Sequence, residues 1–275
     1  MLGWETRTWI SSFVECSEPD WTHYDTSKTI TSLHSMASLF INRQNDGFYR
    51  PLTFISLWFD YKWLGTYWPG YHIQSILIHL VNISLICKLA IRLGLKTRVA
   101  WMAAAFFGVA PVTFETVLWP AARFDLLAAM FTLLSLLTAL DLVKNEHAGP
   151  WKRILLAVFV AAGLLNKESA YCLLPLLCFL LATRNLWGLE SVKRSNALNV
   201  LGIVAAITAL GLIVRIVIYH GLGGYPATSG SSSSHFHLSL KTIETLVTRV
   251  LAVAPFTVNV SAGMSVWLYF LCFCL

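Results

Sequence analysis

Long apolar runs, separated by short polar gaps, make up most of the chain after residue 70. A run of about 18 to 25 mainly apolar residues is long enough to cross the hydrocarbon layer of a bilayer. The runs occupy 71–91, 99–118, 124–143, 197–218 and 244–260, with a shorter broken pair at 154–165 and 169–183 and a final fragment at 264–275. The pattern predicts an all-α, polytopic helical membrane protein.

Lysine and arginine are concentrated in three of the gaps, and these gaps predict how the helices are oriented. The basic gaps contain Arg92, Lys96 and Arg98, then Lys144, Lys152 and Arg153, then Arg184, Lys193 and Arg194. Short loops rich in lysine and arginine stay in the cytoplasm. Because two of the basic gaps flank 154–183, this segment must cross twice or dip in and return, turning at Asn166-Lys167-Glu168. The same parity places outside the cytoplasm the segments 1–70, 111–123, 166–168 and 219–242.

The chain divides into two regions. Residues 1–70 form an extracytoplasmic first loop with aromatic interfacial segments, and 71–275 form the transmembrane bundle. The first region has no run long enough to span a membrane and no signal-peptide pattern, yet the charge pattern places it outside. We therefore expect a first transmembrane helix to be missing from this chain. The end at "SVWLYFLCFCL" suggests that the C-terminus is cut short as well.

Composition agrees with a bilayer environment. Only 12% of the 275 residues are charged, about half the usual globular share, while 56% are hydrophobic. The net charge of +6 could indicate nucleic acid, but the basic residues lie in gaps rather than on one face, so no nucleic-acid partner is predicted. The six cysteines show no Cys-x-x-Cys spacing and lie mainly in apolar segments. They indicate neither a disulfide framework nor a zinc site.

Two histidines lie in the first apolar run. His72 and His79 fall on one helical face, with Ser75 between them and Asn82 one turn further on. Such a polar stripe serves either a substrate site or hydrogen bonds between the helices of a bundle. His-x6-His without a third ligand is weak evidence for a metal. No cofactor is therefore predicted, and a divalent ion stays an open alternative.

Ionisable residues gather on the face that the parity places outside. An ionisable group in or beside an apolar run is costly in a membrane and indicates function by default. These residues are Glu115, Arg123, Asp125, Lys167, Glu168 and Arg215. For Arg123 the alternatives are an ion pair with Asp125 or snorkelling to lipid headgroups. Lys167 and Glu168 have the alternative of pairing with each other, and Arg215 that of snorkelling outward.

Four cations from distant parts of the chain share this outer face. They are Arg50, Arg123, Lys167 and Arg215. Buried cations need anions, and arginine can grip a phosphate through two parallel hydrogen bonds. The pattern predicts a cavity at the outer interface that binds the phosphate head of a lipid.

Four motifs in this order are similar to the membrane domain of the transmembrane and tetratricopeptide-repeat O-mannosyltransferases. They are "YRPLTFISLWFDYKWLG…YHIQSILIHLVN", "APVTFETVLWPAARFDLLAA", "LLNKESAYCLLPLL" and "RIVIYHGLGGY", within about residues 25–225. The chain departs from the family's usual pattern in having Ala110-Pro111 for His-Pro, Ser75 for Asn, and Arg123-Phe124-Asp125 for Arg-Lys-Asp. The resemblance implies the fold of the C-type (GT-C) glycosyltransferases.

The resemblance also implies an activity. Enzymes of this kind take a sugar from a polyprenyl or dolichyl phosphate on the lumenal or periplasmic side, so we expect an inverting transfer of a hexose, with mannose the expected sugar. The acceptor is a hydroxyl of a protein or glycan, and the surroundings are membrane lipids. The location would be the endoplasmic reticulum in a eukaryote and the inner membrane in a bacterium.

The same resemblance assigns residues. Tyr49 and Arg50 of the first motif join the expected substrate site, with the outer-face residues and the two histidines. The family's catalytic carboxylate precedes this motif, and matching places it near Pro19-Asp20, so Asp20 is the expected base. The alternative function is non-enzymatic: a membrane protein that binds or transports lipid phosphates, or an inactive truncated copy.

Overall fold

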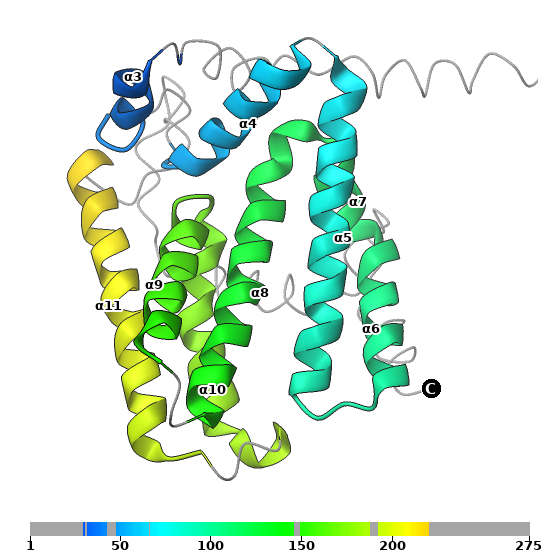
Figure 1. The fold of residues 1–275 in the computed structure, drawn as a ribbon, viewed down its shortest axis with the longest axis vertical. Coiled ribbons are helices and arrows are strands. Elements are labelled where there is room, and N and C mark those ends of the chain that lie inside the picture. Colours follow the sequence, from blue (N-terminus) through cyan, green and yellow to red (C-terminus); the bar gives the residue numbers. More distant parts are fainter. Residues whose placement is uncertain are drawn as a thin grey trace, which may run out of the picture.

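The computed structural model describes residues 30, 32–42, 48–65, 67–145, 149–187 and 192–219, and all regular structure within them is helical. Figure 1 shows long helices side by side, with α3 (Leu33–Ser38) and α4 (Pro51–Leu64) near one end of them. The helices of the bundle are α5 (Trp68–Arg92), α6 (Thr97–Val109), α7 (Pro111–Leu118), α8 (Arg123–Lys144), α9 (Pro150–Leu164), α10 (Leu173–Ala182) and α11 (Arg194–Tyr219). Short 3-10 helices join them: η1 (Pro120–Ala122), η2 (Glu168–Cys172) and η3 (Arg184–Trp187).

Three helical segments within this part of the chain are long and apolar enough to cross a membrane. They are Pro69–Arg92, Pro120–Lys144 and Arg194–Tyr219. The prediction of an all-α helical membrane protein is confirmed. The predicted runs at 244–260 and 264–275 lie outside the described residues.

Helix α8 is the central element. Other protein segments bury 56% of its apolar window, against 22% for α5 and 17% for α11. It packs on α5 and α9 and also touches α4, α7, α10 and α11. The outer helices therefore keep large apolar surfaces free for lipid, while α8 holds the two sides of the bundle together.

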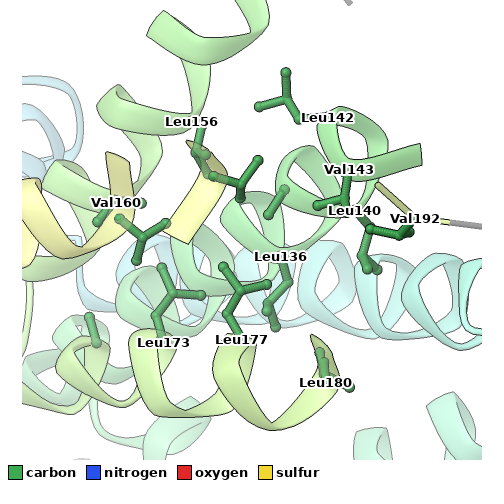
Figure 2. Close-up of a cluster of buried hydrophobic side chains, with 14 of the residues drawn as sticks. Leu136, Leu140, Leu142, Val143, Leu156, Val160, Leu173, Leu177, Leu180 and Val192 are labelled. Atoms are coloured by element: carbon green, nitrogen blue, oxygen red, sulfur yellow. The ribbon is translucent and has the colours of Figure 1, made fainter. Parts of the chain in front are cut away.

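The main apolar core lies where α8, α9, α10 and α11 meet (Figure 2). Leu140, Leu156 and Leu177 are almost or fully buried there, and Val204 of α11 has no exposed surface. Lipid tails are as apolar as leucine, so the gain from this core is close packing rather than escape from water.

The predicted single run at 99–118 is wrong as one helix. The chain forms α6 and α7 with a break at Ala110, whose φ of −64° and ψ of 129° are extended. Pro111 causes this break, because proline cannot donate a helical hydrogen bond and disfavours helical geometry in the residue before it. The break leaves α6 with 13 residues, too short to qualify as a spanning helix by length.

The broken pair forms as predicted. Helix α9 ends at Leu164, the chain turns at 165–167, and η2 leads into α10. Leu165 donates its N–H to Ala161 and Lys167 donates its N–H to Gly163, which closes the last turn of α9. The tip of this pair therefore presents Asn166, Lys167 and Glu168.

Candidate functional site

Within the described residues, the three basic gaps lie at one end of the bundle, and α4, η1 and the tip of the broken pair, which are predicted to be outside, lie at the other (Figure 1). At the basic end Arg92 of α5 pairs with Asp141 of α8, and Lys152 Nζ lies 3.8 Å from the other oxygen of Asp141. Lys144 Nζ also donates to the Arg92 carbonyl at 2.9 Å. This separation of basic gaps from the other loops is what the charge pattern predicts.

At the opposite end, one carboxylate bridges two arginines. Glu168 at the start of η2 accepts from Arg50 Nη2 at 3.1 Å through Oε2 and from Arg215 Nη2 at 2.6 Å through Oε1. The arginine side chains are only 8% and 4% exposed, whereas Glu168 is 29% exposed. Three segments that are far apart in the sequence thus meet at Glu168, with its carboxylate as the more accessible member.

A second ion pair lies beside the first. Lys167 Nζ pairs with Asp125 in the first turn of α8. The ring of Phe124 lies beneath one cation of each ion-pair set, with Arg50 Cζ 4.0 Å and Lys167 Nζ 4.7 Å from its centroid. We call these six residues the outer cation cluster: Arg50, Phe124, Asp125, Lys167, Glu168 and Arg215. Three cations and two carboxylates leave one positive charge in excess, which suits an anionic ligand.

Neutral hydrogen bonds hold the tip of the broken pair against α4. Thr53 Oγ1 donates to Asn166 Oδ1 at 3.0 Å, and Asn166 Nδ2 donates to the Ala162 carbonyl at 2.7 Å. The Leu52 N–H also reaches the Leu165 carbonyl at 3.3 Å. Thr53 and Asn166 are both fully buried, so this contact fixes the position of the neighbouring Lys167 and Glu168.

Tyr49 is buried beside the cluster. Its hydroxyl donates to the Phe40 carbonyl at 3.0 Å, and its ring meets Tyr219 edge-on at 6.4 Å. The Tyr219 hydroxyl in turn donates to the Phe48 carbonyl at 2.8 Å. Tyr49 and Tyr219 therefore tie the segment that carries Arg50 to the end of α11.

The charge states at this end follow from burial and neighbours. Burial alone raises the pKa of Glu168, which lies outside the three spanning helices, but Arg50 and Arg215 outweigh it and hold the pKa below its usual value. Burial raises the pKa of Tyr49, and Tyr219 raises it further. Glu168 is thus an anion at neutral pH and Tyr49 a neutral donor.

Arg123 makes its polar contacts with α4 and α5 rather than with Glu168. It has no exposed surface, pairs with Asp60 of α4, and donates from Nη2 to the Tyr71 carbonyl at 3.2 Å. Asp125, which the sequence left open as an alternative partner of Arg123, pairs with Lys167 instead. The sequence candidates did not include Asp60. It could have been found by the argument used for Glu115, since it is an ionisable residue within an apolar stretch.

The histidine stripe makes contacts between helices. His79 Nε2 lies 3.1 Å from the Gly108 carbonyl of α6, and Asn82 Nδ2 donates to the Leu126 carbonyl of α8 at 2.9 Å. Ser75 is fully buried on the same face, and His72 is half-buried near the start of α5. These bonds are the alternative that the sequence left open for the stripe.

Two candidates are not described in the structure at the level of the side chain. Glu115 lies in α7, but its side chain is outside the described part, and Asp20 lies outside the described residues altogether. Among the His, Cys, Asp and Glu side chains that are described, no three lie close enough together to hold a metal ion.

The sequence also matches a known protein family over the segment that builds most of this site. The sequence profile of the dolichyl-phosphate-mannose-protein mannosyltransferase family matches residues 66–219, more than half of the chain. The chain belongs to this family. Of the six residues of the outer cation cluster, Arg50 alone lies before the matched range, and the other five lie within it.

Individual relatives agree with the resemblance to the transmembrane and tetratricopeptide-repeat O-mannosyltransferases, which is confirmed. A protein O-mannosyl-transferase of Caenorhabditis elegans is 30% identical over 172 residues, 61% of this chain and 23% of the relative. Protein O-mannosyl-transferase Tmtc2 of Drosophila melanogaster is 28% identical over 194 residues, 69% of this chain and 20% of the relative. Human protein O-mannosyl-transferase TMTC4 is 30% identical over 148 residues, 46% of this chain and 20% of the relative.

The chain spans about a fifth of the length of these relatives. No solved structure matches it.

Proposed function

We propose that this chain is the membrane part of a glycosyltransferase that moves mannose from a polyprenyl or dolichyl phosphate to an acceptor hydroxyl of a protein or glycan. The transfer takes place on the lumenal or periplasmic face and inverts the anomeric centre. The membrane is that of the endoplasmic reticulum in a eukaryote and the inner membrane in a bacterium.

The outer cation cluster is the observation that carries this proposal. It brings Arg50, Lys167 and Arg215 together at the end of the bundle opposite the basic gaps, with one positive charge in excess. Arginine and lysine at membrane depth are costly unless they hold an anion, and a lipid-linked phosphate is an anion that reaches this depth. Family membership and the names of the relatives support a mannosyl phosphate as that ligand.

The residues of the cluster suit the leaving group. As the bond between the sugar and the phosphate breaks, negative charge grows on the phosphate oxygens, and nearby cations stabilise it. The lipid phosphate is already a good leaving group, so a general acid is not required. Glu168 keeps Arg50 and Arg215 close together before the donor binds. Asp125 holds the Lys167 ammonium group in position beside them.

The acceptor hydroxyl requires a base. In an inverting transfer the hydroxyl attacks the anomeric carbon directly and loses its proton to a carboxylate within hydrogen-bond reach. We assign this role to Asp20, on the resemblance alone.

The other expected substrate contacts stand as proposals with different roles. Tyr49 lies beside the cluster as a neutral donor. Arg123 and His79 make contacts between helices, and we propose that they also help to shape the substrate site. Glu115 and His72 remain proposed contacts with the donor or acceptor.

A transport-or-transfer experiment tests this function against its non-enzymatic alternative. The full chain, reconstituted in vesicles with polyprenyl phosphate carrying labelled mannose, is given a soluble peptide rich in serine and threonine. We expect label to become covalently attached to the peptide. Movement of the lipid between leaflets without transfer would favour a transporter, and neither transfer nor movement would favour an inactive copy.

A further inference from the structure

Two cations of the outer cation cluster rest on one aromatic ring. Arg50 Cζ lies 4.0 Å and Lys167 Nζ 4.7 Å from the centroid of Phe124. Both distances are well inside the range of about 6 Å over which a cation is attracted to the face of an aromatic ring. Arg50 comes from the segment before α4 and Lys167 from the tip of the broken pair, so Phe124 is a point that these separate segments share.

The ring itself is fixed by its surroundings. Phe124 is buried, with 7% of its surface exposed, and its ring meets that of Trp119 in a T-shaped arrangement, with the ring centroids 6.4 Å apart and the ring planes at 82°. The residue before it, Arg123, is tied to Asp60 and to the Tyr71 carbonyl. The first turn of α8 is therefore held on both sides, and the ring has little freedom to move away from the cations.

The ring supplies an attraction common to both cations. Arg50 and Lys167 carry like charges, and each has its own carboxylate partner on a different element. Glu168 follows Lys167 in the chain, so its pair with Arg50 joins the two segments, but neither carboxylate bridges the Arg50 guanidinium and the Lys167 ammonium group directly. A ring attracts both cations through its quadrupole and adds no charge of its own, so it leaves the positive excess available to a ligand.

We infer that Phe124 is a positioning residue, whose ring holds Arg50 and Lys167 at the spacing that a donor phosphate requires. This inference rests on the proposed function and deepens it, because it assigns the geometry of the phosphate site to an aromatic ring and not only to charged side chains. Phe124 acts through the two cations rather than on the reacting atoms.

Fluorination of the ring tests this directly, because it weakens the negative face while changing the side chain's size little. Phenylalanine, 4-fluorophenylalanine, 3,5-difluorophenylalanine and 3,4,5-trifluorophenylalanine are placed at position 124 of the full chain. Affinity for dolichyl phosphate mannose is then measured in detergent. We expect affinity to fall step by step, by roughly tenfold at the trifluoro derivative, while thermal stability stays unchanged. Phe124→Leu should bind at least as weakly as the trifluoro derivative, and Phe124→Trp should bind nearly as well as wild type.

Phe131, two helical turns along the same α8, is the matched control. Its ring packs against that of Phe159, with the centroids 6.3 Å apart, and no cation of the described residues lies over it. The same fluorinated series at Phe131 should leave donor affinity unchanged.

The outcomes separate the inference from the function on which it rests. If the wild-type chain binds the donor and the Phe124 series is flat, the positioning role is refuted and the proposed function stands. If the wild-type chain binds no donor, the proposed function is refuted, and the inference falls with it.

Discussion

Asp60→Asn should destabilise the protein strongly, because it removes the counter-charge of a buried arginine. Asp60 and Arg123 form an ion pair whose side chains are 4% and 0% exposed. The asparagine keeps the shape of the side chain but leaves the Arg123 guanidinium without its carboxylate. Breaking a buried pair by removing one partner costs about 3 to 5 kcal/mol, because the remaining charge cannot be solvated.

Asp141→Asn is the matched control at the other end of the bundle. Asp141 pairs with Arg92, but the two side chains are 30% and 44% exposed. Water and salt screen such a pair, and its loss should cost less than about 1 kcal/mol. The same chemical change should therefore have very different consequences at the two positions.

A double variant separates the charge effect from packing. Asp60→Leu combined with Arg123→Met removes both charges and keeps apolar volume at both positions. Buried ion pairs replaced in this way are often neutral in stability or better. We expect the double variant to recover most of the loss seen in Asp60→Asn.

The assay is equilibrium unfolding of the purified chain in mixed micelles, followed by tryptophan fluorescence and by the fraction that stays monodisperse on size exclusion. The reasoning would be refuted if Asp60→Asn lost no more stability than Asp141→Asn. A double variant as unstable as Asp60→Asn would also contradict it, since the loss would then not come from an unpaired charge.

Two further predictions concern orientation and the base. A glycan acceptor site engineered near Ser231 should be modified in a eukaryotic membrane and one near Asn145 should not, as scored by a shift in gel mobility; the reverse pattern would invert the bundle. Asp20→Asn should lower transfer by roughly 10²-fold or more while donor binding stays unchanged, whereas Glu18→Gln and Asp25→Asn should have small effects in the same radiolabel assay. Loss in Asp25→Asn with full activity in Asp20→Asn would move the base to Asp25.

The helices could be predicted from the sequence because their signals are local. Apolar runs predict the positions of α5, α8 and α11. The polar tip of the broken pair predicts its turn at 166–168, one residue later than the turn at 165–167 in the structure. The break at Ala110 also has a local signal, since Pro111 follows it. The apolar run continues through the proline, however, and its length alone predicts one continuous helix.

The partners in the site could not be predicted, because pairing depends on packing over long sequence distances. Glu168 pairs with Arg50 and Arg215, which lie 118 and 47 residues away. Helix parity places the cations on one face, but the sequence offers Lys167 as the partner of Glu168. The choice of partner for Glu168 depends on how α4 and α11 pack against the tip of the broken pair, and this packing brings Arg50 and Arg215 to the carboxylate.

Equilibrium binding of dolichyl phosphate mannose to the purified chain tests the central claim, that the outer cation cluster binds the donor phosphate. Arg50→Lys keeps the charge and loses the planar fork, so the binding free energy should become less favourable by about 1 to 3 kcal/mol. Arg215→Gln should weaken binding at least as much. Lys152→Gln, which removes a cation at the opposite end of the bundle, should bind as wild type does. Wild-type affinity in both arginine variants, with correct folding verified, would contradict the account.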